Sequence, residues 1–406
     1  MAKSDTIIQA IDSDVETSEK SLPPARGGIG NNPMRSRDHN RRVVLDLLRQ
    51  HGPSGRKELA AGTQLTAPAV ANILDDLLAE RLILDLGRKV SGRGQPPLQF
   101  ALNPKGAHTL GFEIGVNGLA FTVLDLVGSP ILQRRLALDS LAPQTVMPHL
   151  RAAITEAQSL DNGALLGVGV VMPGPFRTEG LSGIGPTTLP GWEEIDAALM
   201  SETLDVPVTM ENDANAAALT EALFGRAAQL HDVAVLYFGH GVGLGVVSAG
   251  KLLRGARGNA GEVGHIVTER GGRPCACGQQ GCFERYVSRH ALSEALGEPL
   301  TPGSVGALWE ARDPRLLAWI TRAAQHLGPV VMMIENLFDV ETIVLTGQFP
   351  PPVLQEMIAQ APLGPSVAAV AGRDLPRLQV GHASAFIASR GAAALPLYGA
   401  LTPQVQ

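Results

Sequence analysis

A stretch of 23 residues, GHIVTERGGRPCACGQQGCFERY at 264–286, contains all three cysteines of the 406-residue chain. Cys275, Cys277 and Cys282 lie within eight positions of one another, and His265 lies ten residues before the first of them. Three thiols and one imidazole match the ligand set of a closed tetrahedral structural zinc site. The glycines between these residues permit the tight turns that wrap a loop around a small ion. This stretch therefore predicts a Zn²⁺ loop over residues 265–284.

A disulfide and a catalytic thiol are the alternatives to a metal. The first 20 residues lack the basic-then-apolar pattern of a signal peptide, and no run of about 18 apolar residues suggests a membrane span. We therefore expect a soluble cytoplasmic protein, where an odd, tightly spaced set of cysteines favours metal over disulfide. A catalytic cysteine needs one partnered thiol, not three crowded ones. Four protein ligands leave no open position, so the predicted zinc is structural.

Composition divides the chain into three parts. Residues 1–33 are polar without sustained periodicity, and we expect them to form a disordered tail. Residues 33–105 contain 12 Lys/Arg and 7 Asp/Glu, a net charge of +5, whereas residues 106–406 contain 18 and 27, a net charge of −9. A basic segment attached to an acidic body favours a nucleic-acid-binding module. We therefore predict a DNA-binding domain at 34–105 and a two-lobed α/β domain at 106–406.

The order of elements in the first domain is typical of a winged helix-turn-helix. Helical patterns at 40–52, 54–62 and 66–80 are followed by two β-type runs with a basic, glycine-rich connection at 88–96. Ser54 and Thr66 are good N-cap residues for the second and third helices. A small helical domain that binds no DNA is the alternative. The order of elements and the basic hairpin tip favour DNA binding.

Helix 66–80 is the predicted recognition helix, which would enter the major groove. Four outward residues near its N-terminus are candidates for contacts with base edges: Thr66, Ala67, Ala69 and Asn72. Seven basic side chains are candidates for phosphate contacts: Arg41, Arg42, Arg56, Lys57, Arg88, Lys89 and Arg93. Because the helix carries no Arg or Lys, base recognition would depend on Asn72 and on apolar contacts.

From His108 onward, β-type and helical segments alternate, which predicts an α/β architecture. Residues 109–126 have the pattern of a pair of strands that form a hairpin, so we expect the sheet to be mixed. A domain of about 300 residues favours two lobes with a cleft between them over one.

The stretch ENDANAAAL at 211–219 follows a buried strand, the position where α/β sheets bind ligands. Asp213 could accept a proton from a substrate hydroxyl, and Asn212 could hydrogen-bond a polyol. Capping of the following helix explains the same residues equally well. The glycine-rich turn at 238–250 is explained more simply as a tight hairpin than as a phosphate-binding turn. Glu262 and His265 lie three residues apart and would share a face if helical.

Together these stretches resemble the ROK family (repressors, open reading frames and kinases), which shares the two-lobed, actin-like ATPase fold of sugar kinases. GEVGHIVTERGGRPCACGQQGCFE follows the family pattern G-E-x-G-H … C-x-C-G-x-x-G-C-x-E, and NDAN at 212–215 is a second match. The winged helix, with GRGQPP in its wing, resembles the transcriptional-regulator branch, as in xylose repressors. The resemblance covers about residues 40–400.

The resemblance implies a sugar site and names its residues. Six side chains are expected to contact sugar hydroxyls: Asn212, Asp213, Glu262, His265, Glu284 and Thr188. Asp213 would be the catalytic base in kinase members of the family. His265 would bind zinc through one ring nitrogen and face the sugar with the other, because the metal fixes the tautomer and orientation of the ring.

Three departures from the family kinases fall on the nucleotide side. The kinase motif D-x-G-G-T corresponds here to EIGVN at 113–117, His240 stands where a threonine is usual, and Gly347-Gln348 replaces a Gly-Gly pair. We therefore expect a sugar-responsive repressor that binds operator DNA as a homodimer or homotetramer, makes no use of ATP or Mg²⁺, and is not an enzyme. The alternative is an ATP-dependent sugar kinase, similar to glucokinase or N-acetylmannosamine kinase, with Asp213 as general base.

Overall fold

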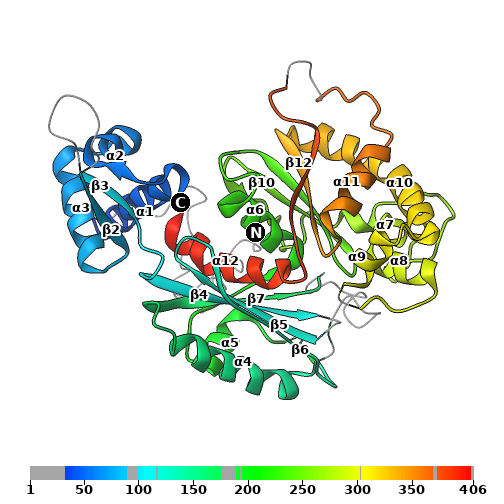
Figure 1. Cartoon of the computed structure of the whole chain (residues 1–406), viewed down its shortest axis with the longest axis horizontal. Helices are drawn as coiled ribbons and strands as arrows, with labels where there is room; N and C mark the ends of the chain where they lie inside the picture. Colours follow the sequence, from blue (N-terminus) through cyan, green and yellow to red (C-terminus); the bar gives the residue numbers. More distant parts are fainter. Residues whose placement is uncertain are drawn as a thin grey trace, which may run out of the picture.

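A computed structural model describes residues 33–88, 98–115, 118–174, 189, 191–192, 194–301, 303–368 and 373–403. The tail expected at 1–33 lies outside these residues except for its last position, and so do the wing tip at 89–97, residues 116–117 and Thr188. The chain forms a small N-terminal domain beside two larger α/β lobes (Figure 1). No helix in the described ranges has the length and hydropathy needed to cross a membrane.

The N-terminal domain consists of three helices and three short strands. These are α1 (Pro33–His51), β1 (Ser54–Gly55), α2 (Arg56–Thr63), α3 (Ala67–Ala79), β2 (Ile83–Arg88) and β3 (Leu98–Leu102). The strands form an antiparallel sheet in the order β1-β3-β2. The predicted winged helix-turn-helix is therefore confirmed, with β1 as an additional strand.

The caps of the second and third helices differ in how well they were predicted. Thr66 caps α3 as expected, since its hydroxyl accepts a hydrogen bond from the Ala69 amide at 3.4 Å. Ser54 does not cap α2, because it belongs to β1. Gly55 is the N-cap instead, and its amide donates to the Glu58 carboxylate at 2.7 Å.

The first lobe contains a mixed five-stranded sheet. Its elements are β4 (Ala107–Gly115), β5 (Gly118–Asp125), β6 (Pro130–Leu136), α4 (Pro143–Gln158), β7 (Ala164–Met172), α5 (Ala197–Leu204) and β8 (Val208–Asn212). The strand order is β6-β5-β4-β7-β8, antiparallel among the first three and parallel from β4 to β8. The predicted hairpin at 109–126 is the antiparallel pair of β4 and β5.

The second lobe repeats the same arrangement. Its strands are β9 (Val233–Phe238), β10 (Val242–Ser248), β11 (Lys251–Leu252), β12 (Thr342–Gly347) and β13 (Leu378–Ala383), in the order β11-β10-β9-β12-β13. Its helices are α7 (Glu284–Val287), α8 (Arg289–Leu296), α9 (Ser304–Glu310), α10 (Pro314–Phe338) and α11 (Pro351–Gln360). In both sheets the third, second, first, fourth and fifth strands are neighbours in that order. This repetition confirms the two-lobed, actin-like fold.

Two helices join the parts of the molecule. α6 (Asp213–Phe224) follows β8 and leads into the second lobe, and α12 (Ile387–Leu401) returns to pack on α6, β4 and β7 (Figure 1, centre). This packing is close, because a β-carbon at Gly169 would lie 1.8 Å from the Ala392 carbonyl oxygen. The far end of α12 shares one buried cluster with the winged helix, in which Leu397 joins Val44 of α1. The winged helix domain is therefore packed onto the body.

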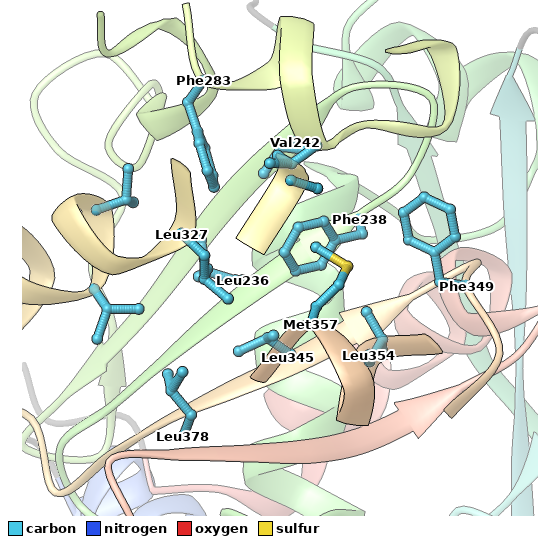
Figure 2. Close-up of a cluster of buried hydrophobic side chains, with 14 of the residues drawn as sticks. Leu236, Phe238, Val242, Phe283, Leu327, Leu345, Phe349, Leu354, Met357 and Leu378 are labelled. Carbon is cyan, nitrogen blue, oxygen red and sulfur yellow. The ribbon is translucent and has the colours of Figure 1, made fainter. Parts of the chain in front are cut away.

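The core of the second lobe holds the end of the cysteine loop in place. Phe238, Leu345 and Met357 belong to this core, and Figure 2 shows Phe283 beside Val242 at its edge. Phe283 is fully buried although it lies between Cys282 and Glu284. Burial of a phenylalanine side chain contributes about 1.5–3 kcal/mol. The core therefore anchors the C-terminal end of the loop.

Candidate functional site

A cavity of about 150 Å³ is lined by residues of both lobes. Five of the six residues predicted to contact sugar line it: Asn212, Asp213, Glu262, His265 and Glu284. They come from the end of β8, from the start of α6, from the loop after β11 and from the start of α7. The structure thus brings together side chains that lie up to 72 positions apart in the sequence.

The two explanations offered for Asn212 and Asp213 are compatible. Asn212 is the N-cap of α6, and its side-chain oxygen accepts a hydrogen bond from the Asn215 amide at 2.7 Å. The side-chain NH₂ group of Asn212 remains available as a donor toward the cavity. Asp213 follows as the first residue of the helix, with one oxygen accepting from the Ala214 amide at 2.9 Å. One junction of strand and helix therefore provides both a cap and two cavity-lining polar groups.

Two carboxyl groups of the cavity, those of Asp213 and Glu262, have raised pKa values. Burial, followed by the negative charge of Glu113, raises the pKa of Asp213 to about 7. Burial also raises the pKa of Glu262, although His265 opposes this shift. At neutral pH, Asp213 therefore exists in both protonation states and can either accept or donate a hydrogen bond with a ligand hydroxyl.

His265, Cys275, Cys277 and Cys282 place their ligand atoms within 4.8 Å of one another. The sulfur atoms of Cys277 and Cys282 lie 3.6 Å apart, and the Cys275 sulfur lies 3.6 Å from Nδ1 of His265. Tetrahedral ligands at Zn–S distances of about 2.3 Å are separated by about 3.8 Å, so this spacing fits a bound metal ion. Burial raises the pKa of the Cys282 thiol to about 11, so a nearby cation is needed to ionise it at neutral pH.

The candidate metal cluster and the cavity share a side chain, that of His265. Nδ1 of His265 faces Cys275, while Nε2 lies 4.0 Å from the Glu262 carboxylate. One oxygen of Glu284 lies 3.3 Å from the Cys275 sulfur, and Glu284 also lines the cavity. The position of this wall of the cavity therefore depends on the geometry of the cluster.

A second cavity, of about 30 Å³, adjoins the first at Asp213 and His240. Inside it, the Gln348 amide donates to Glu113 at 3.2 Å, across the two lobes. A nitrogen of Arg135 lies 3.5 Å from the other oxygen of Glu113. Burial raises the pKa of Glu113, and Arg135 opposes the shift. This network leaves room for about two water molecules in the smaller cavity.

Several cavity residues were missed by sequence reasoning. Arg135 and Tyr237 line the smaller cavity, and Ser288 and His290 line the larger one. His240 borders both cavities, and its buried Nε2 has no hydrogen-bond partner among the described residues. No short motif marks these positions. His240 was noticed only as a departure in a glycine-rich turn, which is the tight hairpin of β9 and β10.

The candidate base-contacting residues lie on one end of α3. Thr66, Ala67 and Asn72 are exposed and Ala69 is half-buried. The acidic residues farther along α3 each face an arginine: Asp76 lies 2.6 Å from Arg37, Glu80 lies 2.7 Å from Arg41, and Asp75 lies 3.7 Å from Arg56. The hydrogen bond from Arg41 holds the pKa of Glu80 below its usual value.

The remaining candidate phosphate contacts differ in their surroundings. Lys57 is exposed and Arg42 is half-buried, and neither forms an ion pair within the part of the chain that the structure describes. Arg88 is exposed at the end of β2, while Lys89 and Arg93 lie outside the described residues. Arg41 and Arg56 therefore neutralise acidic residues along α3. Of the two candidates without an ion pair among the described residues, Lys57 is the more exposed.

Comparisons with known proteins agree with this architecture. The ROK family pattern matches residues 109–395. The xylose repressor of Bacillus spizizenii is 28% identical to this chain over 314 residues, which cover 75% of this chain and 81% of the repressor. A solved ROK family transcriptional regulator, a homologue of the Escherichia coli MLC protein, has a TM-score of 0.66 at 24% identity and covers 90% of this chain and 98% of its own.

A solved kinase matches a smaller part. The ROK family glucokinase from Streptomyces griseus, in complex with glucose and AMPPNP, has a TM-score of 0.57 at 25% identity and covers 71% of this chain and 98% of its own. Residues 1–105 are more than a quarter of the sequence, so the match to the regulator, over 90% of this chain, must extend into the winged helix domain, whereas the match to the kinase, over 71%, need not. The family pattern spans both lobes and the cysteine loop, so this chain belongs to the ROK family.

Proposed function

We propose that this protein is a sugar-responsive transcriptional regulator that acts as a repressor in the cytoplasm. The observation that carries the proposal is the combination, in one packed molecule, of a winged helix-turn-helix with a polar cavity between two lobes. A sugar bound there would bias the positions of the lobes and so change the affinity for operator DNA. The names of two relatives, both xylose repressors, support this function over that of a kinase.

The proposed effector site consists of the five described residues around the 150 Å³ cavity, together with Thr188. Asn212, Asp213, Glu262 and Glu284 would exchange hydrogen bonds with the ring hydroxyls. The proposed zinc would be held by His265, Cys275, Cys277 and Cys282, and His265 would present Nε2 to the sugar. The metal would perform no chemistry on the ligand, because its four positions are filled by protein.

We propose that the N-terminal end of α3 enters the major groove and that two copies of the domain bind two half-sites. This requires a homodimer or homotetramer whose symmetry matches the operator. Lys57 lies exposed at the start of α2, next to the predicted recognition helix, and forms no ion pair with another described residue.

Lys57→Ala is expected to weaken binding to operator and to unrelated DNA by a similar factor. A phosphate contact carries no sequence information, and each one lost should reduce the slope of log Kd against log salt by about one. Fluorescence anisotropy of labelled DNA at several salt concentrations measures both quantities. An unchanged slope would exclude Lys57 as a phosphate contact. Lys251→Ala, an exposed lysine on β11, is the control and should change neither quantity.

The rival function is ATP-dependent sugar phosphorylation with Asp213 as general base. The raised pKa of Asp213 suits a base, and it is the observation that favours this function. The hydrogen bond between Gln348 and Glu113 argues against phosphorylation, because these two side chains occupy the side of the cleft where the kinases of the family would bind the nucleotide. An assay with ATP, Mg²⁺ and a panel of sugars is expected to show no turnover. Rates of about 1–100 per second, as in ordinary kinases, would overturn the repressor proposal.

A further inference from the structure

We infer that Arg49, in α1 of the winged helix, is the residue through which α6 transmits the state of the sugar site to the DNA-binding domain. The inference rests on the proposed function and identifies how its two sites are coupled. α6 begins at Asp213 in the cavity and ends at Phe224 beside α1. At 1.5 Å per residue, this 12-residue helix spans about 18 Å.

The end of α6 makes a specific polar contact with the winged helix. One NH₂ group of Arg49 donates to the Leu223 carbonyl oxygen at 2.6 Å, between residues 174 positions apart. The last carbonyl groups of a helix have no partner within the helix, and a cation there is also favoured by the helix dipole. Arg49 therefore binds α6 where the helix both needs a donor and attracts positive charge.

Arg49 is held rigidly in position for this contact. Asp46, one turn earlier in α1, accepts two hydrogen bonds from the guanidinium, at 2.7 and 3.0 Å. The exposed fractions of the two side chains are only 7% for Arg49 and 16% for Asp46. Water therefore competes weakly for the guanidinium, so the contact depends on the position of Leu223 relative to α1.

α6 is also packed tightly enough to move as a unit. β-Carbons added at Gly243 and Gly245 of β10 would lie 2.7 and 2.5 Å from the β-carbons of Ala214 and Ala218 of α6. At its far end, the Phe224 side chain packs against the cluster that contains Val44 and Leu48 of α1. Because side chains packed this closely leave no free volume, a displacement of one end of α6 is transmitted to the other end. A shift of Asp213 on sugar binding would therefore reach Leu223 and Phe224.

The test replaces Arg49 by methionine, which keeps an apolar stem of similar length but removes the donor to Leu223. The quantity measured is the coupling factor, the ratio of operator Kd with saturating sugar to operator Kd without it. We expect Arg49→Met to bind sugar with the parent affinity and to reduce this factor by about 2- to 30-fold. Arg49→Lys, which retains a donor, should restore part of the factor.

Arg151→Met is the matched control. Arg151 also donates to a helix carbonyl, that of Thr203 in α5 at 3.2 Å, but both groups lie in the first lobe. This variant should keep the parent coupling factor. Hydrogen exchange of the α1 amides provides a second measurement, because sugar should change their protection in the parent and in Arg151→Met but not in Arg49→Met.

The outcomes separate this inference from the proposed function. If the parent responds to sugar and Arg49→Met responds equally, the coupling role of Arg49 is wrong while the regulator proposal stands. If the parent protein binds a sugar but its affinity for operator DNA does not change with any sugar, the proposed function is wrong and so is this inference. Loss of sugar binding in Arg49→Met, with unchanged unfolding temperature, would also overturn the inference, because it would place Arg49 in the binding site.

Discussion

Cys277→Ala is expected to abolish the proposed zinc binding and to weaken sugar binding by at least about 100-fold. A structural zinc contributes about 10–16 kcal/mol of binding energy, and a site with three ligands retains only part of it. Without the ion, no coordination bonds would hold the loop between His265 and Cys282 in its folded conformation. His265 and Glu284 then lose the positions in which they line the cavity. Zinc content per chain and sugar affinity by calorimetry are the two measurements.

The control for this experiment lies two residues away in the same loop. Gln279 is exposed, and only its backbone oxygen is used, as acceptor for the Cys275 amide at 2.9 Å. Gln279→Ala should keep both zinc and sugar affinity. The two lobes have separate buried cores, so Cys277→Ala should keep the far-ultraviolet circular dichroism of the parent. A Cys277→Ala protein that kept its zinc and its sugar affinity would contradict the proposed role of the loop.

Asp213→Asn should weaken sugar binding and at the same time stabilise the unliganded protein. A hydrogen bond to a charged group contributes about 1.5–3 kcal/mol, so its loss should raise the sugar Kd by about 10- to 150-fold. The stabilisation follows from the pKa of Asp213, which rises from an ordinary 3.8 to about 7 on folding. A neutral amide avoids the cost of burying this charge beside Glu113.

The pH dependence distinguishes this explanation from a general change in packing. Because the pKa of Asp213 is raised in the folded state, the stability linked to its protonation is complete below pH 3.8 and is lost as pH rises through about 7. The free energy of unfolding of Asp213→Asn should therefore exceed that of the parent by an amount that grows between about pH 4 and pH 7 and then stays constant. A pKa raised from 3.8 to about 7 corresponds to roughly 4 kcal/mol at pH 8. Equal pH profiles for the two proteins would exclude a buried charge at this position, and Asp161→Asn, at an exposed aspartate, should match the parent.

The sequence predicts the fold where a feature is local. Apolar spacing identifies all three helices of the winged domain, and the β4–β5 hairpin follows from the pair of β-type runs at 109–126. The matching strand order of the two lobes is not visible in this way. β11 has only two residues, and β6 is largely exposed, so neither produces a clear strand pattern. The pairing of α6 with α12 depends on contacts between small residues, such as Gly391 against Ala216, that lie far apart in the chain.

For the site, too, the sequence predicts local features and misses contacts between residues that lie far apart in the chain. Glu262, His265 and Glu284 were found because they flank the cysteines in one continuous motif. The hydrogen bond between Gln348 and Glu113 has no sequence signal, because the two residues are 235 positions apart and the sequence marks each of them only as a departure from a kinase motif. The raised pKa of Asp213 also has no sequence signal, since it arises from burial and from Glu113. Spacing within a loop can be read from the sequence, whereas contacts across the cleft depend on how the lobes close.

Fluorescence anisotropy of labelled DNA measures the proposed coupling between sugar binding and DNA binding. The zinc-loaded protein is titrated onto labelled DNA from the region upstream of its own coding sequence, first alone and then with each sugar of a panel. We expect an operator Kd in the range of about 10⁻⁸–10⁻¹¹ M, raised at least about tenfold by one sugar that also raises the unfolding temperature. Unrelated DNA should show no such change. Operator affinity that stays constant in the presence of every sugar that binds the protein would contradict the account.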